Sequence, residues 1–195
     1  MRKKIGLLLF GVILLGVSKY VYEVHFNYNF KEISENKVYK SGVIPPEKIA
    51  DYINDHQINS VIDLRFPHTK DKINNPEIPE ELTAEKEAVE KLDGVTYFNL
   101  GTDQVPTQAT VDEFLQIMDD SSNYPVLLHC YHGVGRAQMF SAIYRIEYEG
   151  WSNQDAREKT RLLLKGSSFD EGKPKGDYLL YIPYQLFNHK RPITE

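Results

Sequence analysis

The chain has 195 residues, of which 41% are hydrophobic and 26% charged, so its composition is that of a globular protein and excludes disorder along its whole length. This length corresponds to about one domain with room for a sizeable core. The single cysteine, Cys130, excludes an intramolecular disulfide and cysteine-rich zinc or iron–sulfur sites, and the net charge of −5 disfavours nucleic-acid binding as the main function.

The N-terminal segment has the composition of an export signal. Three basic residues at positions 2–4 are followed by Ile5–Val17, an unbroken run of apolar and glycine residues. This run is shorter than the roughly 20 residues of a membrane span and is typical of a signal-peptide core. Gly16 and Ser18 are small residues at the −3 and −1 positions of a possible cleavage site, whereas Val21, Tyr22 and Val24 extend the run toward an uncleaved anchor. Both alternatives leave the positive end in the cytosol and the remainder outside it.

We therefore expect a signal peptide or membrane anchor at residues 1–24, a linker at 25–36 and one folded domain at 37–195. Within the domain, strand-like and helix-like segments alternate. Strands are expected at residues 38–41, 60–65, 95–100 and 126–129. Helices are expected at residues 46–56, 80–92, 110–119 and 137–149, with another after Ser152. The alternation predicts an α/β fold with a layered, mostly parallel sheet flanked by helices.

Local sequence signals mark several helix ends. Gly94 and Gly150 follow expected helices and favour the left-handed backbone that ends a helix. Residues 110–113 have the pattern of a capping box, with Thr110 as the N-cap. Ser152 is the expected cap of the helix that follows it.

Cys130 directly follows the expected buried strand, and Arg136 lies six residues later. The residues between them are Tyr131, His132, Gly133, Val134 and Gly135. A strand that turns abruptly into a helix leaves backbone N–H groups unpaired, and the helix dipole adds positive potential. Such a turn holds an anion of phosphate size, and the arginine offers two donors to its oxygens. The same field favours the thiolate of Cys130, aligned for attack on phosphorus.

A cysteine at the end of a strand is more often a buried packing residue. Here, however, the arrangement His-Cys-x-x-Gly-x-x-Arg occurs whole, on a strand-to-helix turn, which favours the nucleophilic interpretation. Residues 129–136 resemble the signature loop of cysteine-dependent protein-tyrosine and dual-specificity phosphatases, of the small bacterial type. The resemblance extends over residues 37–165. It implies a protein-tyrosine-phosphatase-like fold, hydrolysis of phosphomonoesters through a phosphocysteine intermediate, and no metal or cofactor.

The resemblance also implies a general acid on the loop after the preceding strand. Asp103 fits this position, because it follows the strand expected at 95–100 and lies 27 residues before Cys130. The alternative is an exposed turn aspartate. His129 is expected to support the loop, and His132, inside it, either contacts substrate or is solvated.

The sequence departs from the family pattern at Ala137, where most relatives carry Ser or Thr. That hydroxyl is thought to stabilise the departing thiolate when the phosphoenzyme is hydrolysed. The phosphatases of regenerating liver resemble this chain in having alanine there, so the change is compatible with activity. It predicts that hydrolysis of the phosphocysteine limits turnover.

Phosphotyrosine in proteins is the expected substrate, with dual specificity as an option. A phosphoinositide or inositol phosphate is disfavoured because no lysine lies between Cys130 and Arg136, although a membrane-proximal N-terminus favours it. Basic residues recur at four-residue spacing at Arg157, Arg161 and Lys165, which places them on one helix face. This face is expected to be solvated; the alternative is that it attracts an acidic substrate to the site.

Two further classes of protein remain as alternatives. A phosphopeptide-binding module with weak turnover is consistent with Ala137. A sulfur-transfer domain also uses a loop cysteine, but it does not need the spacing of Arg136 together with Asp103.

Overall fold

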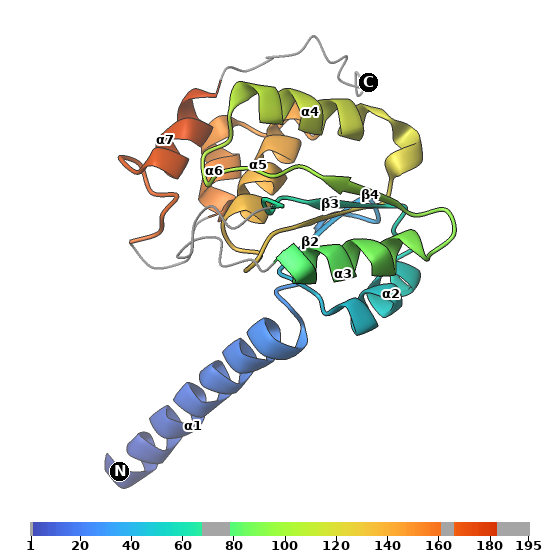
Figure 1. The fold of residues 1–195 in the computed structure, drawn as a ribbon. Coiled ribbons are helices and arrows are strands. Elements are labelled where there is room, and N and C mark those ends of the chain that lie inside the picture. The colour runs from blue at the N-terminus through green and yellow to red at the C-terminus, as the bar shows by residue number, and fades with distance from the viewer. Residues whose placement is uncertain (1, 68–78, 161–165, 183–195) are drawn as a thin grey trace.

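The chain is built around one five-stranded sheet (Figure 1). The computed structural model describes residues 2–67, 79–160 and 166–182. The strand order is β1-β2-β5-β3-β4, in which β2, β5, β3 and β4 are parallel and β1 is antiparallel to β2 at the edge. The strand bounds are Lys31–Ser34 (β1), Val38–Ser41 (β2), Ser60–Asp63 (β3), Thr96–Asn99 (β4) and Val126–His129 (β5). The predicted mostly parallel α/β fold is confirmed.

Helices cover both faces of this sheet, with α2 and α3 on one face and α4 to α7 on the other (Figure 1). Their bounds are Pro46–Asp55 (α2), Pro79–Glu90 (α3), Gln108–Asp119 (α4), Arg136–Tyr148 (α5), Asn153–Thr160 (α6) and Pro174–Tyr181 (α7). The alternation of side chains along β5 serves both layers. Val126 and Leu128 pack in the cluster that includes α4 and α5, whereas Leu127 packs with residues of α2 and α3.

The structure corrects the expected start of α4. Its N-cap is Thr107, whose side-chain oxygen accepts a hydrogen bond from the N–H of Thr110 at 3.3 Å. The expected cap, Thr110, therefore lies inside the first turn, where its hydroxyl bonds to that of Thr107. The other caps are confirmed: Gly94 and Gly150 have φ of +80° and +70°, and Ser152 accepts from the N–H of Asp155.

Strand β1 lies inside the segment expected to be a linker. It pairs with β2 through partners such as Lys31 and Lys40, which makes it the edge of the sheet. Because β1 is short and polar, its residues show no periodic pattern that would predict a strand. The folded domain therefore begins before residue 37.

The N-terminal helix α1 (Arg2–Val21) projects away from the sheet and its helices (Figure 1). A single π-helical turn, Tyr22–Phe26, follows it. The window Leu9–Phe26 is long and apolar enough to cross a membrane, with a mean hydropathy of 1.3, and a signal sequence meets the same criterion. Both expectations for residues 1–24 thus stay open.

Candidate active site

Cys130 stands at the carboxyl end of the central strand β5, where ligands of parallel α/β sheets usually bind. All four residues of β5 are buried, and strands β2 and β3 pair with it on either side. Cys130 itself is 3% exposed, and Arg136, 2% exposed, opens helix α5. The predicted strand-turn-helix arrangement is thus present.

Two glycines let the loop between Cys130 and α5 pack closely against its neighbours. Gly133 has φ of +72°, and a Cβ there would lie 2.5 Å from the backbone nitrogen of Gly42, just after β2. Gly135 is the N-cap of α5, and a Cβ there would lie 2.6 Å from Oε1 of Gln104. Side chains at these positions would push the loop off β2 or push Gln104 away from the loop.

A pocket of about 380 Å³ lies at this loop. Three separate segments line it, through residues Gln104, Cys130, His132, Val134, Gly135, Arg136, Ser168 and Lys175. It brings together five loop residues expected from the sequence. Of the other two, Gly133 is buried against the end of β2, and Tyr131 accepts a backbone hydrogen bond from Val43 at 3.0 Å.

The guanidinium of Arg136 is anchored from behind. Its Nη1 donates to the carbonyl of Leu64, the residue after β3, at 2.9 Å. Because Arg136 is buried and tied to the backbone of a neighbouring strand, its side chain is held in place before a ligand arrives.

Asp103 lies on the loop between β4 and α4, as expected, but it is exposed and is not among the residues that line the pocket. Its neighbour Gln104 does line the pocket. The structure therefore brings the Asp103 loop to the site through Gln104.

A buried lysine that the sequence interpretation missed lies behind the loop. Lys40 of β2 is 4% exposed, and its Nζ donates to the carbonyl of Gly133 at 2.7 Å. Burial, together with the nearby charges of Lys31 and Arg145, lowers the pKa of Lys40 to about 8, while Cys130 opposes the shift. The signal was available, since Lys40 lies within the strand expected at 38–41, and a lysine in a sheet flanked by helices needs a buried partner.

A second lysine, Lys175 near the start of α7, lines the pocket itself. Its Nζ donates to Oε1 of Gln104 at 3.1 Å. Burial lowers the pKa of Lys175, and its interaction with Cys130 partly offsets that effect. No sequence signal pointed to Lys175, because it lies 45 residues after Cys130 and outside any recognisable motif.

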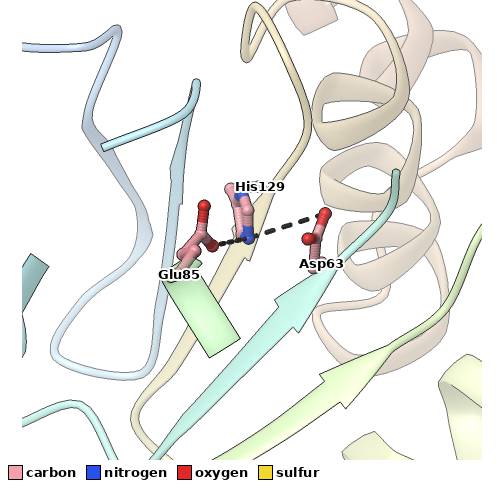
Figure 2. A group of neighbouring side chains, drawn as sticks. All are labelled: Asp63, Glu85 and His129. Carbon is pink, nitrogen blue, oxygen red and sulfur yellow. Dashed lines mark ion pairs between the residues drawn. The ribbon is translucent and has the colours of Figure 1, made fainter. Parts of the chain in front are cut away.

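A buried ionic network lies beneath the loop (Figure 2). Nε2 of His129 is 2.7 Å from Glu85 Oε1 and 3.7 Å from Asp63 Oδ1. The fully buried Arg65 joins both acids, since its Nη2 is 2.7 Å from each of Asp63 Oδ2 and Glu85 Oε2. Tyr97 donates its hydroxyl hydrogen to Asp63 at 2.6 Å. His129, which was expected to support the signature loop, thus lies in a charged cluster that joins β3, α3 and β5.

Asp63, Glu85 and His129 also have the geometry of a metal-ligand group, because their ligand atoms lie within 4.8 Å of one another. The guanidinium of Arg65 already supplies the cation that both carboxylates need. Burial alone would raise the pKa of Asp63, but His129 and Arg65 outweigh it and the pKa is lowered. Both carboxylates of the group therefore already have a cationic partner in Arg65.

The expectation that Arg157 lies on a solvated or substrate-guiding helix face is wrong. Arg157 is 3% exposed and donates to the carbonyl of Phe169 at 3.2 Å, so it holds the segment before α7 and does not face solvent or substrate. Arg161 and Lys165 lie outside the described residues.

Comparison with known families adds to this geometry. The profile of a family described as "DSP-PTPase phosphatase fused to NAD+ Kinase" matches residues 18–173, which is most of the chain. The chain belongs to this dual-specificity-type phosphatase family. The family agrees with the one that the resemblance of residues 129–136 implied.

Matches to curated relatives cover a smaller part of the chain. The chain is 37% identical over 69 residues to the dual specificity protein phosphatase TpbA of Pseudomonas aeruginosa, a match that covers 35% of this chain and 30% of that protein. The match therefore spans less than a third of the relative.

Solved structures show the same fold over a longer span. The crystal structure of P. aeruginosa TpbA has a TM-score of 0.56 at 22% identity and covers 78% of this chain and 84% of that one. The catalytic domain of the PP-IP phosphatase SIW14 from S. cerevisiae has a TM-score of 0.57 at 19% identity, with coverage of 78% and 85%. PTPMT1 has a TM-score of 0.55 at 19% identity, with coverage of 77% and 90%. These likenesses place the phosphatase in a protein-tyrosine-phosphatase-like fold.

Proposed function

We propose that this phosphatase hydrolyses phosphomonoesters through a phosphocysteine on Cys130, with phosphotyrosine in proteins as its substrate and dual specificity as an option. The observation that carries this proposal is the pocket in which Cys130 and Arg136 meet at the N-terminus of α5. The curated relative TpbA, described as a dual specificity protein phosphatase, supports the substrate class.

In the first step the thiolate of Cys130 attacks phosphorus and the bond to the leaving oxygen breaks. Arg136 and the N–H groups of residues 131–136 hold the phosphoryl oxygens. Asp103 gives its proton to the leaving oxygen. In the second step water attacks phosphorus, Asp103 accepts the proton, and the S–P bond breaks to release inorganic phosphate and the thiolate.

Three features place positive charge or N–H donors near the attacking sulfur of Cys130. The N-terminus of α5 directs its dipole and unpaired N–H groups at the loop. Lys40 and Lys175 both interact electrostatically with Cys130. The fixed guanidinium of Arg136 adds a third cation at the pocket.

Asp103 acts after the loop between β4 and α4 moves closer to bound substrate. Its side chain is exposed and outside the pocket lining, while Gln104 lies against the signature loop. A small rotation of this loop about Gln104 is the motion that the proposal requires.

A phosphate-release panel tests the proposal, with an aryl phosphate, phosphotyrosyl and phosphoseryl peptides, and phosphoinositides. We expect wild-type protein to release phosphate, Cys130→Ser to release none, and Asp103→Asn to lose about a hundredfold or more on substrates with poor leaving groups. Activity that survives in Cys130→Ser would contradict the mechanism. Tight phosphopeptide binding without phosphate release by wild-type protein would instead indicate a binding module.

One observation favours a second candidate, a phosphoinositide or inositol phosphate phosphatase. Lys175 supplies the pocket with the basic residue that the signature loop lacks, and the similar structure of SIW14 is described as that of a PP-IP phosphatase. Faster release from the phosphoinositides than from the phosphotyrosyl peptides in the same panel would select this candidate.

Residues 1–24 serve as a signal peptide or membrane anchor and place the domain outside the cytosol. The apolar window and the projection of α1 from the domain support this part of the proposal. A reporter enzyme that is active only outside the cytosol, fused after residue 36, is expected to gain activity. A silent reporter in a well-expressed fusion would contradict export.

A further inference from the structure

The pocket receives a cation from a segment remote from the signature loop. Lys175 is the second residue of α7, yet it lines the same pocket as Cys130 and Arg136. The side chain is half-buried, so its charge acts in an environment less polar than water.

The contacts of Lys175 are with neutral groups. Its Nζ donates to the amide oxygen of Gln104 at 3.1 Å and lies 4.8 Å from the centroid of the Phe169 ring. Within residues 2–67, 79–160 and 166–182, no carboxylate forms an ion pair with it. An anion from a substrate is a stronger partner for an ammonium group than a neutral amide is.

Close backbone packing fixes the position of this lysine. A Cβ at Gly176 would lie 2.1 Å from the carbonyl oxygen of Asp170, so only glycine lets the start of α7 approach the preceding segment. On the other side of the pocket, Gln104 lies against Gly135 of the signature loop. The hydrogen bond between Lys175 and Gln104 therefore bridges α7 and the loop that carries Asp103.

We propose that Lys175, with Gln104 and Ser168, forms a second anion subsite beside the signature loop. Arg136 and the loop amides hold the phosphoryl group that is transferred, which leaves Lys175 for a different group. The subsite selects phosphomonoesters that carry a second anionic group, a phosphate or a carboxylate, next to the scissile phosphate. This inference rests on the proposed phosphatase function, whose substrate class it narrows.

Matched substrate pairs that differ only in the second anion test the subsite. One pair is a phosphotyrosyl peptide with aspartate or asparagine beside the phosphotyrosine, and the other is a vicinal inositol bisphosphate and the corresponding monophosphate. For Lys175→Gln we expect kcat/KM to fall about tenfold more on the doubly anionic member than on the singly anionic one, because the loss of a charge near Cys130 lowers both members alike. The pair that shows the loss identifies the source of the second anion.

Three further variants separate binding from other roles. Lys173→Gln removes a charge from an exposed residue two positions away and outside the pocket lining, and it is expected to behave like wild type on every substrate. Lys175→Arg keeps the positive charge and is expected to keep the preference for the doubly anionic member of each pair. If Lys175 only docks the Asp103 loop, Lys175→Gln and Gln104→Leu will lower kcat equally on both members of each pair, and the subsite is refuted.

A binding measurement keeps this test independent of turnover. Calorimetric titration of inorganic pyrophosphate and inorganic phosphate into the Cys130→Ser protein compares a double anion with a single one. We expect Lys175→Gln in that background to weaken pyrophosphate binding about tenfold and phosphate binding less than about twofold. Equal weakening of both, or of neither, would overturn the subsite. Failure of all phosphate release with selective weakening of pyrophosphate would refute the proposed function and leave the subsite standing.

Discussion

The base and the rim of the pocket are built in different ways. At the base, Cys130 and Arg136 lie with Lys40 above the buried network of Asp63, Arg65, Glu85 and His129, and each of these side chains is at most 4% exposed. At the rim, Asp103, Gln104, Ser168 and Lys175 are exposed or half-buried and come from two segments distant in sequence.

The difference suggests a division of tasks. The charged groups at the base are joined to one another and to strand ends, so the position of the phosphoryl group is set before substrate binds. The rim residues have fewer and weaker contacts, which leaves them free to exchange a neutral partner for a substrate group. Under the proposed function, the base serves the phosphoryl transfer and the rim distinguishes substrates.

The largest expected effect follows from breaking the base. Arg65→Met removes the cation shared by Asp63 and Glu85 and leaves two buried carboxylates beside His129 and the Tyr97 hydroxyl. We expect the free energy of unfolding to fall by about 3–5 kcal/mol, measured by urea denaturation. The control Lys86→Met breaks an exposed ion pair with Glu90. It is expected to change the free energy of unfolding by less than about 1 kcal/mol. Similar unfolding midpoints for the two variants would show that the network does not stabilise the base.

A smaller effect is expected from the buried charge at Lys40. Its pKa of about 8 lies below the usual value, so the ammonium loses its proton as the pH rises through 8 and Cys130 loses a neighbouring cation. We expect kcat/KM for an aryl phosphate to fall over that range in wild-type protein. In Lys40→Arg, which stays charged, this alkaline limb moves to higher pH.

The control for Lys40 is Lys37→Met, which alters an exposed lysine just before β2. It is expected to leave the alkaline decrease in kcat/KM at the same pH as in wild type. Lys40→Met, which has no charge at any pH, is expected to be about tenfold slower than wild type at pH 7. An unchanged limb in Lys40→Arg would assign it to a different group.

The smallest expected effect concerns which step limits turnover, formation of the phosphocysteine or its hydrolysis. Ala137 is fully buried in the first turn of α5 and offers no hydroxyl to the departing thiolate. We expect a burst of product from an aryl phosphate in rapid-mix kinetics, and we expect Ala137→Ser to raise the steady-state rate by up to about tenfold. A linear trace at all substrate concentrations would place the slow step before the phosphoenzyme, where the rim acts.

The sequence predicted the elements that depend on local pattern. The four parallel strands and most helix ends follow from apolar runs, glycines and caps within a few residues of each boundary. Thr107 and Thr110 show the limit of such signals, since both have capping chemistry and only the extra turn of α4 decides between them. Strand β1 gave no local signal because it is held by pairing with β2.

Cys130 and Arg136 were determined by the sequence alone, because only five residues separate them on a strand-to-helix turn, which must place both at one loop. The tertiary structure decided everything that reaches this loop from elsewhere. Lys40 and Lys175 approach Cys130 only because β2 pairs with β5 and α7 packs against the segment that precedes it. Arg157 was mistaken for a surface residue because helical spacing defines a face of a helix, whereas packing alone decides whether that face meets solvent or protein.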